Sequence, residues 1–141
     1  MKLKISVLIT FALLLITDGV FAQSFKVVVN SSNSVTALTK KEASDLFLKK
    51  KSKWTDGNAV SPVDLSSSSK VREEFSQQVL GKSISAVRNF WQQAAFSGTA
   101  SAPTEKSSDE EVIEFIKKNP GGIGYVSSSA NTSGVKTVSI N

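Results

Sequence analysis

The chain has 141 residues, with 17 Lys and Arg against 12 Asp and Glu, and a net charge of +5 at pH 7. It contains no cysteine and no histidine, which excludes disulfides, ordinary zinc sites, cysteine nucleophiles and Ser-His-Asp triads. Charges of both signs are interspersed, so the mild basic excess predicts solubility and attraction for anions rather than a nucleic-acid partner.

The first 22 residues have the pattern of a secretory signal. Lys2 and Lys4 give a positive start, Ile5 to Ile16 form a short apolar stretch, and Val20-Phe21-Ala22 resembles a cleavage site. The apolar stretch is shorter than the ~20 residues that a membrane-spanning helix needs. We therefore expect removal of this segment and a single periplasmic domain over residues 23–141 without a membrane anchor; an uncleaved anchor is the alternative.

The next segment predicts a strand and then a helix. Phe25 to Asn30 is rich in β-branched residues, which suits a strand covered on both faces in a mostly parallel sheet. Thr39 and Glu42 form a capping box in front of a run with helical apolar spacing. The lysines at positions 49, 50, 51 and 53 form a dense positive run. We interpret this run as the solvated end of the helix, with nucleic acid or an anionic membrane as the alternative partner.

A second strand and helix meet at a run of serines. A turn at residues 56–58 precedes a strand over residues 60–65, in which Pro62 indicates an edge or a strand start. Ser66 to Ser69 then lead into a helix over residues 69–80. Its apolar residues lie four positions apart: Val71, Phe75 and Val79.

The rest of the chain predicts two helices and two strands. Ser83 has the position of an N-cap for a helix with Trp91 in its apolar stripe, and a loop of small residues follows over 97–104. Ser108 and Glu111 form a second capping box. The last two strands are expected at residues 123–126 and 135–140. Strands that alternate with helices in this way indicate an α/β sandwich.

The serine run before the 69–80 helix is the main candidate for ligand binding. A helix start presents unpaired amide donors and a partial positive charge, and both favour an oxyanion. The loop also follows the carboxyl end of a strand, which is the usual ligand edge of an open α/β sheet. The alternative is that Ser69 only caps the helix. The candidate binding residues here are Ser66, Ser67, Ser68, Ser69, Lys70 and Arg72.

Polar residues after the first strand form a second candidate. Ser32 and Asn33 would line the same edge of the sheet and add contacts to the ligand, with a plain turn as the alternative. Asp64 offers a general base, but no second catalytic group stands at an identifiable spacing. We therefore predict neither an enzyme nor a metal site or cofactor.

Five segments, taken in their order and spacing, extend across almost the whole stretch from residue 25 to residue 127. They are VVVNSSNS (27–34), LTKKEASDLF (38–47), KWTDG (53–57), SKVREEF (69–75) and PGGIGYV (120–126). As a series they resemble the periplasmic phosphate-binding components of ABC transporters, in particular a short, single-lobed branch of phosphate substrate-binding proteins.

The resemblance implies a single lobe of the type II periplasmic-binding-protein fold, with an anion site at a helix start. In full-length relatives the loop reads Arg, three residues, then Ser-Gly-Thr, and the arginine, hydroxyls and backbone amides hold phosphate. Ser69 matches the serine of that motif. Lys70 and Val71 stand at the glycine and threonine positions, and Leu65 stands at the arginine position beside Asp64.

The resemblance also implies a missing half, because full-length relatives close two lobes around the ligand. An open half-cleft leaves the anion solvated, so we expect weak binding unless a second copy or another protein supplies the missing wall. Together these expectations describe a secreted, periplasmic solute-binding-like protein for phosphate or another small oxyanion, linked to phosphate ABC transport. The alternative is a non-transport protein-interaction module that keeps the fold without a small-molecule ligand.

Overall fold

The computed structural model describes residues 24–141, so the signal expected over residues 1–22 lies outside the described residues. Its strands are β1 (Phe25–Asn30), β2 (Ala37–Leu38), β3 (Ser61–Leu65), β4 (Thr104–Lys106), β5 (Gly122–Ser127) and β6 (Val135–Ile140). Its helices are α1 (Lys40–Phe47), α2 (Lys70–Phe75), α3 (Ile84–Phe96) and α4 (Asp109–Lys118), with a π-helical turn η1 (Ser76–Leu80) that continues α2. No helix of this described part is both long and apolar enough to cross a membrane.

The six strands form one mixed sheet in the order β2-β6-β1-β5-β3-β4. Strand β1 pairs with β5 and with β6 in the antiparallel sense, whereas β3 is parallel to both β5 and β4. The predicted α/β architecture is confirmed. Because β1 runs opposite to β5 and β3 runs with it, the carboxyl ends of β1 and β3 lie at opposite edges of the sheet.

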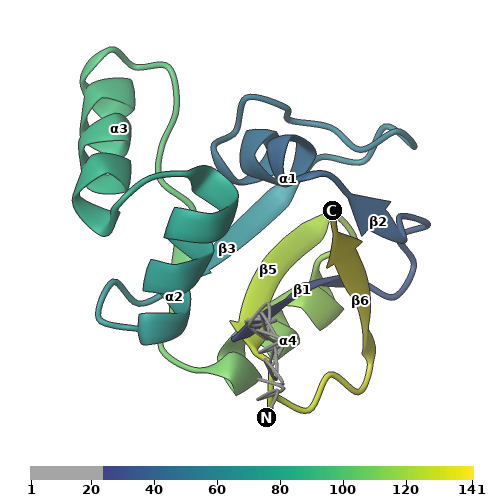
Figure 1. The fold of residues 1–141 in the computed structure, drawn as a ribbon. Coiled ribbons are helices and arrows are strands. Elements are labelled where there is room, and N and C mark those ends of the chain that lie inside the picture. Colours follow the sequence, from purple (N-terminus) through teal and green to yellow (C-terminus); the bar gives the residue numbers. More distant parts are fainter. Residues whose placement is uncertain (1–23) are drawn as a thin grey trace, which may run out of the picture.

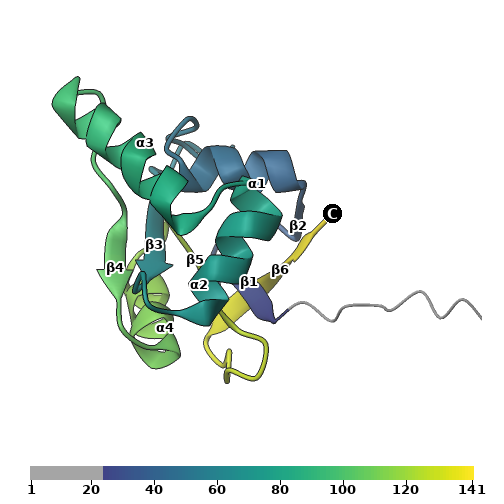
Figure 2. The same ribbon diagram turned by 60° about the vertical axis from the view of Figure 1, so that its left-hand side comes forward.

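Helices cover both faces of the sheet, as Figures 1 and 2 show. Two neighbouring residues of β5 contact helices on opposite faces of the sheet, because successive side chains of a strand point to opposite sides. Tyr125 stacks on Phe75 of α2 with ring centroids 3.9 Å apart and also contacts Phe47 of α1. A Cβ added to Gly124 would lie 2.9 Å from a methyl group of Val112 in α4. The glycine therefore allows α4 to pack closely on the opposite face.

Helix α3 stands apart from this three-layer body, and both views show it projecting from one end of the molecule (Figures 1 and 2). A small second cluster of buried apolar residues, Leu48, Val87 and Trp91, joins it to the rest. At its far end Phe96 is 97% exposed. We call α3 with its flanking residues, 83–104, the arm.

Helix caps follow the sequence with one exception. Thr39 and Glu42 form the expected reciprocal capping box at α1, and Ser69 and Ser83 cap α2 and α3. Ser108 caps α4, but the Glu111 carboxylate accepts from the amide and hydroxyl of Ser107 instead of the Ser108 amide. The second predicted capping box is thus only half formed, because the Glu111 carboxylate binds both donors of Ser107 and leaves the Ser108 amide.

Candidate anion-binding site

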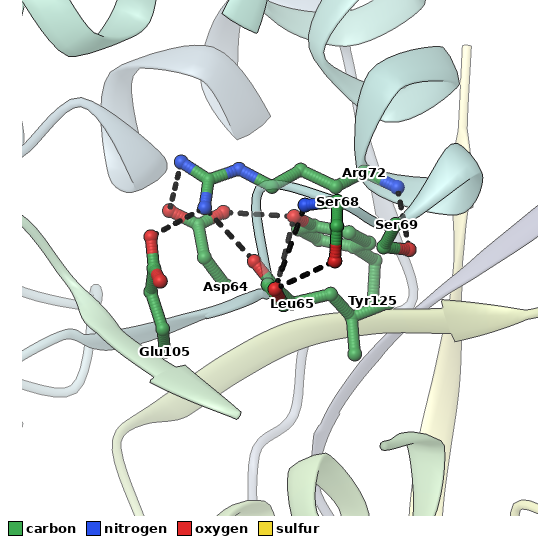
Figure 3. Close-up of polar contacts among 8 residues, drawn as sticks. Asp64, Leu65, Ser68, Ser69, Arg72, Glu105 and Tyr125 are labelled. Carbon is green, nitrogen blue, oxygen red and sulfur yellow. Dashed lines mark hydrogen bonds and ion pairs between the residues drawn. The ribbon is translucent and has the colours of Figure 1, made fainter. Parts of the chain in front are cut away.

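The loop between β3 and α2 turns sharply out of the sheet. Asp64 and Leu65 are still buried, whereas Ser67 and Ser68 are exposed. The Ser69 amide donates to the Ser66 carbonyl at 2.9 Å, and the Ser69 hydroxyl accepts from the Arg72 amide at 3.3 Å. Figure 3 shows Ser68 and Ser69 close to Leu65, the last residue of β3. The helix thus begins where the sequence predicts, with Ser69 as its N-cap.

Several backbone donors of this loop lack an internal acceptor. Among residues 24–141, no hydrogen bond to the chain is present for the amides of Ser67, Lys70 or Val71. The Ser68 amide has only a 3.5 Å contact to the hydroxyl of Ser66. Lys70 is exposed beside these groups. Unpaired amides at a helix start carry partial positive charge, so the loop presents a weak electropositive surface to solvent.

Arg72 does not contribute its charge to this surface. Its side chain is 8% exposed and points back toward the sheet (Figure 3). One guanidinium nitrogen, Nη1, donates to the Leu65 carbonyl at 2.9 Å and to Glu105 Oε1 at 2.5 Å. The other, Nη2, lies 3.9 Å from Asp64 Oδ2. The sequence placed Arg72 in the first helical turn, but the helix directs it inward to two carboxylates.

Tyr125 completes this buried polar network from the neighbouring strand. Its hydroxyl donates to Asp64 Oδ1 at 2.9 Å and accepts from the Leu65 amide at 3.3 Å. Burial, together with the nearby Asp64 charge, raises the pKa of Tyr125 far above its ordinary value, so the hydroxyl stays protonated. The network brings together β3, α2, β4 and β5, and sequence analysis missed its Tyr125 and Glu105 members.

Burial and charge pairing oppose each other in the network. Burial raises the pKa of the Asp64 carboxyl above its ordinary value and outweighs the lowering by Arg72 and by the Tyr125 hydroxyl. For Arg72, burial lowers the pKa, but Asp64, Glu105 and Tyr125 together outweigh it and raise the pKa. Arg72 therefore stays charged. It pairs with both carboxylates, so the group has no net positive charge for an external anion.

The second candidate group, Ser32 and Asn33, lies at the opposite edge of the sheet. The expectation that it shares an edge with the serine run is wrong, because β1 is antiparallel to β5. The Asn30 side chain accepts from the amide and hydroxyl of Ser32, and the Asn33 side chain accepts from the Val35 amide at 2.9 Å. The alternative of a plain turn describes these residues, and they cannot contact a small ligand bound near Ser69.

The described residues also bear on metal chemistry. In the range 24–141 no cluster of three or more acidic, cysteine or histidine side chains has an arrangement that could hold a metal ion. The loop itself offers backbone amides, serine hydroxyls and the Lys70 ammonium.

The fold is that of one lobe of a periplasmic binding protein. A solved structure of an ABC-type phosphate transport receptor from Vibrio cholerae superposes with a TM-score of 0.64 at 18% identity, over 85% of this chain and 48% of the receptor. PstS from Borrelia burgdorferi gives a TM-score of 0.64 at 16% identity, over 84% of this chain and 47% of PstS.

A third structure, from Clostridium perfringens and solved with bound phosphate, gives a TM-score of 0.64 at 19% identity, over 83% of this chain and 44% of that structure. The chain thus spans less than half the length of these structures, and the expected resemblance is confirmed at the level of the fold. No protein-family model and no curated protein matches the sequence.

Proposed function

We propose that this chain is an exported, periplasmic solute-binding-like protein without enzyme activity that binds phosphate or another small oxyanion weakly. The proposed contacts are the amides and hydroxyls of residues 66–69 and the Lys70 ammonium. One observation carries the proposal: unpaired amides of an exposed loop lie at a helix start in a fold shared with phosphate-binding proteins. A role linked to phosphate ABC transport belongs to the same proposal.

The charges around the loop predict the strength of binding. Arg72 is held by Asp64 and Glu105, so only the Lys70 ammonium adds a full positive charge to the amides. Charge-assisted hydrogen bonds to a solvated anion contribute about 1 kcal/mol each, and a few of them give a dissociation constant in the millimolar range. A second wall, from another copy or another protein, would exclude water and raise the affinity.

Calorimetric titration of phosphate and of sulfate into purified protein tests the proposal directly. We expect saturable heat in the millimolar range and its loss in the double variant Ser69→Ala/Lys70→Ala. The matched control is Ser83→Ala/Lys82→Ala, which removes the N-cap of α3 and a neighbouring lysine at another helix start. No heat in the unaltered protein, or equal loss in both variants, would remove the proposed site.

A second candidate function is protein interaction, and the arm favours it. Residues 83–104 contain one charged residue, Arg88, although 21% of the whole chain is charged. The side chain at the tip, Phe96, is 97% exposed. Depletion of charge together with exposed aromatic residues is typical of the core of protein interfaces. The partner would be a second copy or another periplasmic protein that supplies the missing wall.

Sedimentation of the purified protein separates the two partners. A dimer that Phe96→Asp converts to monomer, while Ser129→Asp on a distant exposed turn leaves it intact, supports self-association. A monomer that captures a stoichiometric protein from periplasmic extract in phosphate-free buffer supports another partner. A monomer that captures nothing, with phosphate heat intact, leaves the oxyanion proposal as the function.

A further inference from the structure

A cavity of about 320 Å³ lies between the arm and the body, beside the β3–α2 loop. Three parts of the chain line it: the loop and α2 on one side, α3 on another, and the start of β4 with the residues before it. Its volume is near the lower end of the range for small-molecule sites. The arm therefore forms one wall of a space large enough for a small organic molecule.

The wall contributed by α3 is mostly apolar. Five side chains of one helix face line the cavity, and three of them are apolar: Ile84, Trp91 and Ala95, with Arg88 and Gln92 as the polar pair. Trp91 is 7% exposed and belongs to the second apolar cluster, so its ring is fixed in place. A fixed indole ring flanked by aliphatic side chains suits the flat or branched body of an organic ligand.

The charges that line the cavity leave one positive group uncompensated. Arg72 and Glu105 both border the space, but they pair with each other at 2.5 Å, and Asp64 lies behind Arg72. Arg88 is exposed, lies one turn before Trp91, and has no ion pair within the described residues 24–141. A monoanion would match this single free guanidinium. A dianion would meet the Glu105 carboxylate without further compensation.

We propose that this cavity binds a small organic monoanion, such as an aromatic or branched aliphatic carboxylate. Its carboxylate pairs with Arg88 and its apolar body packs against Trp91, Ile84 and Ala95. Inorganic phosphate fits this site poorly, because it would leave the apolar wall wet and bring a second negative charge toward Glu105. The proposal goes beyond the oxyanion site, since its anchor is Arg88 rather than Ser69 and Lys70.

Benzoate is the probe, and Trp91 is the reporter. The chain has two tryptophans, and Trp54 lies outside the cavity, where its indole nitrogen donates to the Gly121 carbonyl. In protein labelled with 5-fluorotryptophan, we expect benzoate to shift the ¹⁹F resonance of Trp91 saturably and to leave that of Trp54 in place. A Trp91→Phe variant assigns the two signals. No saturable shift of Trp91, or equal shifts of both signals, would overturn the proposal.

Two comparisons test the ligand chemistry. Benzyl alcohol, which has the ring without the charge, should bind at least tenfold more weakly than benzoate. Arg88→Gln should weaken benzoate binding about tenfold, the effect expected for loss of one charge-assisted pair. Lys82→Gln, which changes the net charge equally outside the cavity, should leave it unchanged. Equal affinity for the two ligands, or equal effects of the two variants, would contradict recognition of an anion.

The same titrations separate this proposal from the oxyanion site. Ser69→Ala/Lys70→Ala should abolish phosphate heat and leave the benzoate shift of Trp91 intact. A Trp91 shift with phosphate but none with benzoate would assign the cavity to the oxyanion site and overturn the present inference.

Discussion

Two polar loops leave the sheet at opposite edges, and their sequences are alike while their structures differ. The loop after β1 contains Ser31, Ser32, Asn33 and Ser34, and the loop after β3 contains four serines. After β1, asparagine side chains bind the amides of Ser32 and Val35. After β3, the hydroxyls of Ser66 and Ser68 bind each other and the Ser69 hydroxyl caps α2, while several backbone amides have no acceptor in the described chain. An asparagine side chain accepts hydrogen bonds from nearby backbone amides, whereas a serine run at a helix start leaves such amides free to bind a ligand.

The largest effect should come from the charge beneath the second loop. Arg72→Met removes the cation that balances buried Asp64 and half-exposed Glu105. A buried carboxylate without its partner costs about 3–5 kcal/mol of unfolding free energy. Urea unfolding at neutral pH measures this loss. Arg88→Met removes an exposed side chain with no ion pair among the described residues and should change stability by less than about 0.5 kcal/mol. Similar small effects of both substitutions would mean that water solvates the Asp64 network.

The first loop has its own buried anchor, Asn30. Its side-chain amide donates to the Ile116 carbonyl at 2.8 Å, and its side-chain oxygen accepts from the amide and hydroxyl of Ser32. Asn30→Ala should therefore cost about 2–3 kcal/mol, because it removes several buried hydrogen bonds at once and leaves the Ile116 carbonyl only the Asn119 amide at 3.3 Å.

Asn131 provides a matched control for that substitution. Its side chain makes the same pair of bonds, to the amide and hydroxyl of Ser133, but on an exposed turn. Asn131→Ala should cost about 0.5 kcal/mol, the usual size of a surface effect. Equal losses in the two variants would show that the turn itself, and not its bond to α4, supplies the stability.

The contribution of Tyr125 to stability should depend on pH, because its hydroxyl binds the titrating carboxyl of Asp64 beneath the second loop. Burial raises the pKa of folded Asp64, so folded protein binds this proton more tightly than unfolded protein does. The stability from that proton is fully present below the unfolded pKa of Asp, about 3.9. It is lost as the pH rises through the folded pKa. The Tyr125 hydroxyl lowers the Asp64 pKa by favouring the charged carboxylate, so it matters most at high pH.

Tyr125→Phe should consequently lose about 1–3 kcal/mol at pH 8 and clearly less at about pH 3.5, below the unfolded pKa of Asp. The Tyr125 hydroxyl itself stays protonated across this range, because burial raises its pKa. Urea midpoints at the two pH values give the comparison. In an Asp64→Asn background, the loss caused by Tyr125→Phe should no longer vary with pH. A loss that varies equally in both backgrounds would assign the pH dependence to another group.

The comparison of the two loops also shows that the sequence could predict helix starts but not the direction of a strand. Caps, turns and apolar spacing act within a few residues, so the starts of α1, α2 and α3 could be predicted from Thr39, Ser69 and Ser83. The direction of β1 could not, because it depends on pairing with strands that lie about a hundred residues away. The edge of the sheet reached by Ser32 and Asn33 follows from that direction. The two- and three-residue strands β2 and β4 have too little sequence to show a pattern.

The candidate site divides in the same way. The exposed part, from Ser66 to Lys70, is contiguous and could be predicted from residue types at a helix start. The buried part joins Asp64 with Tyr125 and Glu105, 61 and 41 positions further along the chain, and no local pattern connects them. The Arg72 side chain points inward to these buried groups, because two carboxylates and a carbonyl stabilise its charge better than solvent near the loop does.

The smallest effect is expected from two single hydroxyls, and it tests the functional difference between the loops. Ser69→Ala removes the cap of α2 and should cost about 1 kcal/mol. Ser32→Ala should cost only a few tenths, because Asn30 still accepts from the Ser32 amide. Phosphate at a concentration equal to its dissociation constant stabilises a protein by about 0.4 kcal/mol. Ser32→Ala should retain this increment in thermal unfolding, and Ser69→Ala should lose it. Retention of the increment in both variants would mean that phosphate acts through general salt effects and not through the loop after β3.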